Sequence, residues 1–400
     1  MNNWPTVKLS GVLSRVARAE MPIAGKNYRQ IGVKLWGEGA YERESIDGAQ
    51  TKYKQLFRSE EGDVIVNKIW ARNGSIAVVS KQLAGCFGSG EFPMFSPNRK
   101  LLDPIWIHWL TKTPDFWSQC DEKSQGTSGK NRIQPEQFLS VEIPLPPLAE
   151  QRRIVSRIEE LSSQIQEARS LRQHAIEEAD AIYRCQLDLA MTPHSEGWSR
   201  KTVNDIIISM DAGWSPQCDD NPAKEGMWGV LKTTSVQWCD FQPQYNKALP
   251  LTLTPIPALT IKEGDVLVTR AGPRKRVGVV AAVRQDNPKL TISDKLIRLR
   301  TNHSIITSRF LELSLSSSFS QEHIVQRKTG LADAQVNISQ AILKSTPIAF
   351  PSLAEQRRIV AELDALQAQM DALKRLQAET AAELDALLPA ILDRAFKGEL

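Results

Sequence analysis

The residues of this 400-residue chain best suited to chemistry are basic and amide side chains gathered in glycine-bearing segments. The segment RAGPRKR contains Arg270, Arg274, Lys275 and Arg276, and it directly follows DVLVT, an apolar run that predicts a strand. Loops on a strand scaffold are where recognition residues usually lie. Arg and Lys can neutralise phosphates or bind guanine, and Asn and Gln can pair with adenine. The segment therefore predicts DNA contact, with a solvated turn as the alternative.

Three further segments have the same character. The first half of the chain has KIWARNG after the predicted strand DVIVN, and each half has a polar, glycine-bearing stretch further along. A mobile surface loop is the alternative interpretation of these two stretches. The candidate DNA-binding residues in the three segments are Lys68, Arg72, Asn73, Lys130, Asn131, Arg132, Lys328, Gln335 and Asn337.

Signatures of enzymes are largely missing from the sequence. GTSGKN at 126–131 lacks the first glycine and the Ser/Thr of a phosphate-binding loop, and no GxGxxG follows a predicted strand. The five histidines have neither ligand nor triad spacing. Pro114-Asp115 with Asp121-Glu122-Lys123 loosely matches a metal-dependent nuclease pattern, but the surrounding apolar run predicts a helix instead of the neighbouring strands which that chemistry needs. We expect a chain that binds without catalysing and that holds no metal or cofactor.

The chain contains an internal repeat, which shows how these segments are positioned. LAEQRRIV occurs at 148–155 and again at 353–360, an offset of 205, and EGDVIV at 61–66 matches EGDVLV at 263–268. Each unit of the repeat is a variable globular block followed by a near-constant block. The expected boundaries are 1–147 and 192–352 for the globular blocks and 148–191 and 353–400 for the near-constant ones.

Both near-constant blocks predict long helices with a coiled-coil seam. Their apolar positions recur on average every 3.5 residues, with a local irregularity near Leu171 and Leu376. Because the first helix leads from one globular block to the other, the second must run back along it, antiparallel. Pro389 is expected to bend the last turns of the second helix. The residues expected to pair the helices or dock other subunits are Ile154, Ile158, Leu161, Ile165, Leu171, Ile359, Leu363, Leu366, Met370, Leu373 and Leu376.

The fold class expected is therefore α+β. Two tandem mixed α/β domains are separated by two long antiparallel coiled-coil helices, with an approximate two-fold axis between the halves.

Composition is that of an ordinary globular protein, with 41% hydrophobic and 24% charged residues. The globular blocks carry net charges of +4 and +5, and the helical blocks carry −2 and −3. Five cysteines without a CxxC pair argue against a disulfide framework and favour a reducing compartment. With no apparent signal peptide or membrane span, we expect a cytoplasmic location.

The doubled proline-x-LAEQRRIV boundary, the GDV strands and the closing AFKGEL make the whole chain resemble the specificity subunit of type I restriction-modification systems. The resemblance implies two target-recognition domains, each reading half of a bipartite double-stranded DNA sequence. It also implies helices that dock two methyltransferase subunits and a larger complex with restriction subunits. S-adenosylmethionine, ATP and Mg²⁺ would then be bound by the partner subunits.

Two other classes of function stay open at this point. One is the DNA-recognition subunit of another nuclease or methyltransferase system. The other is a helical scaffold whose end domains bind proteins.

Overall fold

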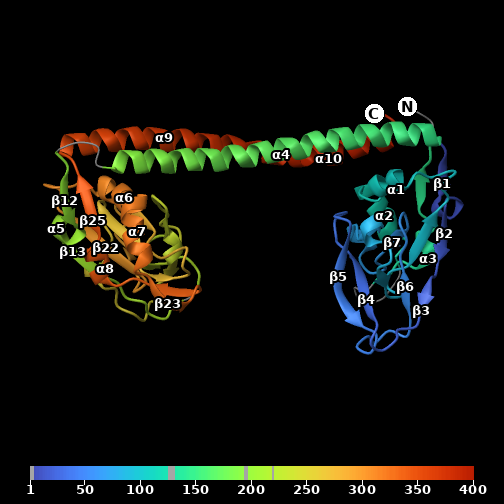
Figure 1. The fold of residues 1–400 in the computed structure, drawn as a ribbon, viewed down its shortest axis with the longest axis horizontal. Coiled ribbons are helices and arrows are strands. Elements are labelled where there is room, and N and C mark those ends of the chain that lie inside the picture. The colour runs from blue at the N-terminus through green and yellow to red at the C-terminus, as the bar shows by residue number, and fades with distance from the viewer. Residues whose placement is uncertain (1–3, 125–130, 193–196, 219) are drawn as a thin grey trace. The chain divides into compact units, whose positions relative to one another are not determined.

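The computed structural model describes residues 4–124, 131–192, 197–218 and 220–400. The chain divides into two compact units. Unit 1 comprises residues 1–172 and 377–400, and unit 2 comprises residues 173–376. Each unit therefore contains one globular domain together with part of the long helices (Figure 1).

The domain of unit 1 is built on small antiparallel sheets and short helices. A four-stranded sheet has the order β2-β10-β7-β8, a five-stranded sheet has the order β3-β6-β9-β4-β5, and β1 pairs with β11. The strands are β1 Thr6–Lys8, β2 Leu13–Val16, β3 Ala19–Glu20, β4 Asn27–Val33, β5 Ala40–Asp47, β6 Leu56–Arg58, β7 Val64–Val66, β8 Ile76–Val78, β9 Phe87–Gly88, β10 Met94–Pro97 and β11 Glu142–Pro144. The helices are α1 Pro104–Leu110, α2 Pro114–Glu122 and α3 Pro135–Phe138.

Local sequence accounts for the helices of this domain. α1 and α2 each begin with a proline, and the side chains of Asp103 and Thr113 accept hydrogen bonds from the free backbone N–H groups of the first turn. The pattern that loosely matched a nuclease, Pro114 to Lys123, lies on and directly after α2. As the apolar run predicted, its carboxylates therefore do not stand on neighbouring strands.

The domain of unit 2 repeats this plan with a larger set of elements. Its four-stranded sheet has the order β13-β22-β18-β20, and β12 pairs with β25, as β1 does with β11 in unit 1. The strands are β12 Ser199–Thr202, β13 Ile207–Ala212, β14 Gly229–Leu231, β15 Val236–Gln237, β16 Asp240–Phe241, β17 Asn246–Ala248, β18 Asp265–Thr269, β19 Ala271–Gly272, β20 Val280–Ala282, β21 Leu290–Thr291, β22 Leu296–Thr301, β23 Thr329–Ala332, β24 Gln335–Asn337 and β25 Pro347–Phe350. The helices are α5 Val203–Ile206, α6 Ser308–Ser316, α7 Ser318–Gln326 and α8 Gln340–Lys344.

The long helices are α4 Leu148–Met191, α9 Leu353–Glu379 and α10 Ala381–Phe396. In unit 1, α10 lies antiparallel to the first part of α4, where Arg169 forms an ion pair with Asp385 at 2.7 Å. In unit 2, α9 lies antiparallel to the second part of α4, where Lys374 pairs with Asp180 at 2.8 Å. The antiparallel arrangement predicted from the repeat is confirmed (Figure 1).

The seam between these helices differs from the prediction in one respect. Ile154, Ile158, Ile165, Ile359, Leu363 and Met370 are buried, and Leu161, Leu366 and Leu373 are partly buried. Leu171 and Leu376, in contrast, are 62% and 58% exposed, so burial of the stripe is interrupted at the irregularity seen in the sequence, and their role in helix pairing or subunit docking stays a prediction. In both helices the stripe takes a step of four residues here and continues through the half-buried Arg172 and Gln377. The physical reason is that an α-helix has 3.6 residues per turn. A stripe with a repeat of 3.5 residues therefore drifts around the helix, and a step of four residues brings it back to the face of the partner helix.

The second helical block is interrupted before the proline expected to bend it. α9 ends at Glu379, Thr380 has φ −93° and ψ 2°, and α10 then contains Pro389 in its interior. The Arg172 guanidinium donates hydrogen bonds to the carbonyls of Gln377 and, at 3.5 Å, Thr380. A cation is favoured at this position because carbonyls at a helix C-terminus lack intrahelical partners.

The repeated LAEQRRIV sequence anchors each domain to its helix through a buried glutamine. The Gln151 side chain accepts from Asp103 N at 2.8 Å and donates to the carbonyls of Leu101 and Pro146, each at 2.8 Å. The Gln356 side chain makes the equivalent set of hydrogen bonds in unit 2, to Thr307 N and to the carbonyls of Ile305 and Pro351. Both glutamines are fully buried.

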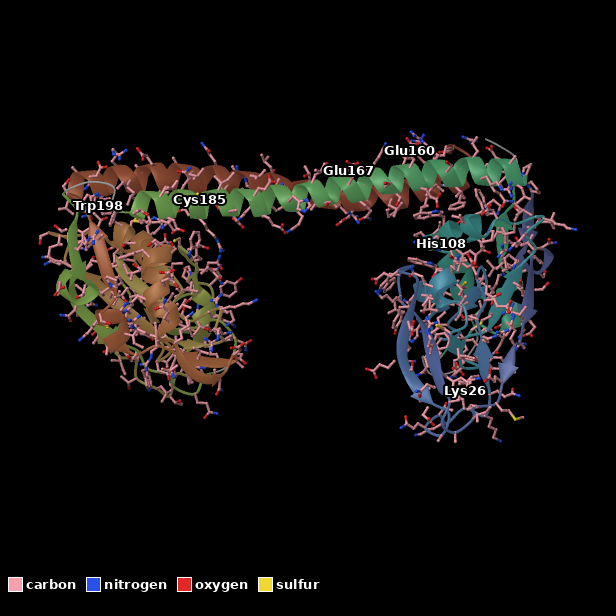
Figure 2. The ribbon with its side chains drawn as sticks, in the orientation of Figure 1. Lys26, His108, Glu160, Glu167, Cys185 and Trp198 are labelled. Carbon is pink, nitrogen blue, oxygen red and sulfur yellow. The ribbon has the colours of Figure 1, made fainter. Side chains whose placement is uncertain are left out.

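The described part of the chain contains no helix that is long and apolar enough to cross a membrane. Of its cysteines, Cys86, Cys120 and Cys239 are buried, Cys218 is partly exposed, and Cys185 is exposed on α4 (Figure 2).

Candidate nucleic-acid interface

In unit 2, the fold brings together two basic segments that are far apart in the sequence. The short strand β19 follows Arg270 and pairs with β24, so that Ala271 lies opposite Asn337. Arg274 is held against the turn between β23 and β24, since its backbone N and its Nε donate to the carbonyl and carboxylate of Asp333 at 2.8 and 2.7 Å. The side chain of Lys328 completes the contact by donating to the carbonyl of Arg274 at 3.1 Å. The two segments form one surface.

The exposed side chains of this surface are Arg274, Lys275, Gln335 and Asn337, and Arg270 is partly exposed. The amide oxygen of Asn337 accepts a hydrogen bond from Thr329 Oγ1 at 2.8 Å, which fixes the direction of the side chain. Burial, together with the nearby Arg274, lowers the pKa of Lys328. Cations crowded in this way favour a bound anion, because an anion would relieve their repulsion.

Arg276 is placed differently from the expectation of DNA contact. Its guanidinium donates to the carbonyls of Thr233 and Val236 at 2.6 and 3.0 Å and to the side chain of Gln237 at 2.9 Å. These hydrogen bonds hold residues 233–237 against the loop. We therefore assign Arg276 a structural role, and its inward direction is a correction to the sequence-based expectation.

Unit 1 brings its two predicted segments together in the same way. Ile133 N donates to the carbonyl of Lys68 at 2.9 Å. Glu91 then pairs with both Lys68, at 3.6 Å, and Arg132, at 3.2 Å. Asn131 lies beside Arg132 at the start of the described segment and is partly exposed, whereas Lys130 lies outside the described residues.

The other two predicted residues of unit 1 lie on a 3-10 turn, Ala71–Asn73, after β7. The side chain of Arg72 lies 3.9 Å from the carboxylate of Asp121 and is largely covered. The carbonyl of Asn73 accepts a hydrogen bond from Trp36 N at 2.7 Å. Trp36 is 60% exposed and has a positive φ of 57°, a strained backbone conformation for a large side chain.

Sequence reasoning missed Trp36 and the acidic residues Asp333 and Glu91. Each makes its contact across a long separation in the chain, and an isolated acidic residue carries no local signal of its partner. Asp333 and Glu91 hold the neighbouring basic side chains by ion pairs. The basic and amide side chains positioned in this way can bind phosphates and base edges of DNA. Among the described residues, no group of three or more His, Cys, Asp or Glu side chains could hold a metal ion.

Comparisons with known proteins give a consistent result. Residues 1–175 and 196–381 both match the sequence model of the type I restriction modification DNA specificity domain. The specificity subunit of the Escherichia coli type I restriction enzyme EcoEI is 29% identical over 89% of this chain and 76% of its own length. That of EcoKI, from E. coli strain K12, is 24% identical over 75% of this chain and 66% of its own length.

Two solved structures are similar over all of this chain. The HsdS subunit from Thermoanaerobacter tengcongensis has a TM-score of 0.62 and 27% identity, with 98% of that subunit covered. A chain from a structure describing complex assembly and conformational transition of a type I restriction-modification system has a TM-score of 0.73 and 25% identity, with 99% covered. The doubled domain, the repeated helical boundary and these similarities show that the chain belongs to the type I restriction-modification DNA specificity family.

Proposed function

We propose that this chain is the DNA-recognition subunit of a type I restriction-modification complex and that each domain reads one half of a bipartite target. The observation that carries the proposal is the recurrence of the same construction in both domains. In each, a basic loop after a buried strand is joined by backbone hydrogen bonds to a second polar segment, although the loop sequences differ. Two domains that share a scaffold but differ in their loop sequences are suited to reading two different half-sites.

The partner subunits follow from the same proposal. The long helices would dock two methyltransferase subunits, and restriction subunits would join the complex. Adenine methylation requires the base to be taken out of the duplex into a catalytic pocket. We place that chemistry, together with S-adenosylmethionine, ATP and Mg²⁺, on the partners, and we assign this chain no catalytic step.

The proposal is tested by sequencing the methylated adenines of cells with and without this gene, with the neighbouring methyltransferase gene present in both. We expect a split motif of methyladenine that disappears with the gene. An unchanged methylation pattern in cells where the methyltransferase is active would refute the proposal.

A second experiment separates a DNA reader from a scaffold that binds proteins. Reversing the charge of Arg274 and Lys275 to Glu should abolish methylation of the motif while the complex still assembles, because both side chains are exposed. Lys344→Glu, at the exposed end of α8 in the same domain, is the matched control. Arg276 is left unchanged, since its loss would disrupt residues 233–237 themselves.

A further inference from the structure

A cavity of about 350 Å³ lies in the domain of unit 2 beside β14. Val230 and Leu231 of this strand give it an apolar wall, and Ser293, in the turn between β21 and β22, lies on its lining. Three lysines surround it, and they come from different parts of the domain: Lys232, Lys247 and Lys295. None of these residues belongs to the predicted DNA-binding set.

The hydroxyl of Ser293 indicates that the cavity is built for a ligand. Ser293 is only 7% exposed, and its Oγ has no hydrogen-bond partner among the described residues. A buried hydroxyl without a hydrogen-bond partner destabilises the folded state, so such groups are rare and call for an explanation. A polar atom of a bound molecule would supply the missing hydrogen bond.

The lysines make the cavity suited to an anion. Lys247 pairs with Asp220 at 2.7 Å, but Asp220 is 85% exposed, and an exposed pair of this kind is weak enough to exchange partners. Lys232 Nζ donates to the carbonyl of Asp220 at 3.0 Å. Lys295 is exposed and has no carboxylate within ion-pair distance among the described residues. Lysine side chains from three parts of the domain thus line a cavity with an apolar wall, a combination that suits a phosphate attached to a flat apolar group.

Hydrogen bonds join the lining of the cavity to the basic loop of the same domain. Arg270 N donates to the carbonyl of Lys295 at 2.9 Å, which joins one side of the cavity to the start of the basic loop. The Arg276 guanidinium donates to the carbonyl of Thr233, which also lines the cavity. A DNA strand bound along the loop would therefore pass beside the cavity.

We propose that this cavity binds one nucleotide of the target DNA. Lys232 and Lys295 contact its phosphate, Val230 and Leu231 contact its sugar or base, and Ser293 donates a hydrogen bond to it. The inference rests on the proposed function and adds a nucleotide site to it. A free nucleotide has the same chemistry, and the experiments below distinguish the two sources.

The first test uses Cys218, which lines the cavity and is partly exposed, as a reporter of occupancy. In a Cys185→Ser background the other cysteines are buried, so alkylation by N-ethylmaleimide can be followed at Cys218 by mass spectrometry. The full chain in complex with its methyltransferase subunits is treated with and without duplex carrying the methylated motif. We expect at least a five-fold slower reaction with this duplex and little effect of a scrambled one. An unchanged rate at saturating specific DNA would overturn the proposal.

The second test measures DNA affinity as a function of salt concentration. Lys295→Gln should weaken binding and reduce the slope of log K against log salt by about 1, as expected for one lost phosphate contact, and Lys344→Gln should leave both unchanged. Ser293→Ala should weaken binding without changing the slope. Because the alanine removes an unpartnered hydroxyl, the thermal stability of this variant should be equal or higher. Wild-type affinity and slope in Lys295→Gln would overturn the proposal.

Two further outcomes separate this proposal from the proposed function. If adenosine 5′-monophosphate slows alkylation of Cys218 and specific DNA does not, the cavity serves a free nucleotide and the assignment to DNA is overturned. If the wild-type complex binds no DNA at all, the proposed function itself fails. If wild-type DNA binding is intact and neither ligand protects Cys218, only the cavity assignment fails.

Discussion

Replacing Gln356 by methionine tests how the repeated sequence anchors a domain to its helix. The side chain is fully buried, and each of its three hydrogen bonds, to Thr307 N and the carbonyls of Ile305 and Pro351, measures 3.0 Å. Methionine has a similar volume, so little cavity is created. The N–H of Thr307 and the carbonyls of Ile305 and Pro351 nevertheless lose their hydrogen bonds to the Gln356 side chain. At about 1–1.5 kcal/mol each, the expected loss of unfolding free energy is roughly 3–4 kcal/mol.

The measurement must report on unit 2 itself, because a chain of two units does not unfold in a single two-state step. Hydrogen exchange followed by mass spectrometry resolves peptides around 300–316 and 347–360, and their opening free energies should fall together in Gln356→Met. Gln369→Met, at an exposed position of α9, is the matched control and should change them by less than 0.5 kcal/mol. The equivalent change at Gln151 should act on peptides of unit 1.

Gln356→Glu adds a pH dependence with a defined sign. The carboxyl can still accept from Thr307 N, but when ionised it faces two carbonyl oxygens in a buried site. Burial therefore raises its pKa in the folded state above the usual value near 4.3. A raised pKa contributes stability below the unfolded value and loses it as the pH rises, so the variant should weaken progressively above pH ~4.3. The reasoning is refuted if Gln356→Met opens no more easily than Gln369→Met, or if Gln356→Glu shows the opposite pH trend.

Three further predictions concern the long helices and a partly buried histidine. Arg172→Met should cost about 1–2 kcal/mol of local stability near the end of α9, seen as faster hydrogen exchange there, because two carbonyls lose a charged donor; unchanged exchange would contradict this. Burial, reinforced by Lys112, lowers the pKa of His108 on α1 to about 4 (Figure 2). The neutral imidazole therefore adds stability above pH ~6.5, and this stability is lost as the pH falls through 4. His108→Gln cannot take up the proton, so it should lose less stability in acid than the wild type, by at most about 3 kcal/mol. Equal acid sensitivity of the two proteins in thermal melts would argue against this. If the long helices set the distance between the two half-sites, inserting four residues after Ser170 and four after Thr380 should lengthen that distance by about 6 Å. Methylome sequencing should then show a spacer longer by one to two base pairs at about 3.4 Å each, and a change in either half-sequence would contradict this role of the helices.

The main architecture could be predicted from the sequence because its signals are periodic or repeated. Identical eight-residue segments located the start of both long helices, and chain connectivity required them to be antiparallel. The spacing also located the irregularity near Leu171 and Leu376, but it could not predict that both leucines are exposed, because an apolar residue type does not specify which side of a seam it takes. The sequence also did not predict the interruption at Thr380, where Arg172 donates hydrogen bonds to the freed carbonyls, and the bend expected at Pro389 stays a prediction.

The candidate interface was predicted as separate segments and not as a surface. Position after a buried strand identified the loop at 270–276, and the repeat identified its counterpart in unit 1. Pairing of β19 with β24 depends on a register that no local pattern specifies. Arg274 and Arg276 are two residues apart in one basic run, yet the first is exposed and the second binds carbonyls of residues 233 and 236. Residue type alone could not distinguish them, because the neighbours in the folded domain decide which arginine forms hydrogen bonds within the protein.

The two anchors explain how the same LAEQRRIV segment can attach two different domains to the long helices. The side chains of Gln151 and Gln356 form their hydrogen bonds with backbone atoms of the residues that precede α1 and α6, and of a proline that precedes each long helix. A backbone N–H or carbonyl has the same chemistry whatever side chain follows it. The recognition loops can therefore change without altering the anchor, and the anchor constrains only the path of the chain at Asp103 and Thr307. Separating attachment from the loops in this way allows the same anchor to carry two domains with unlike candidate DNA-binding surfaces.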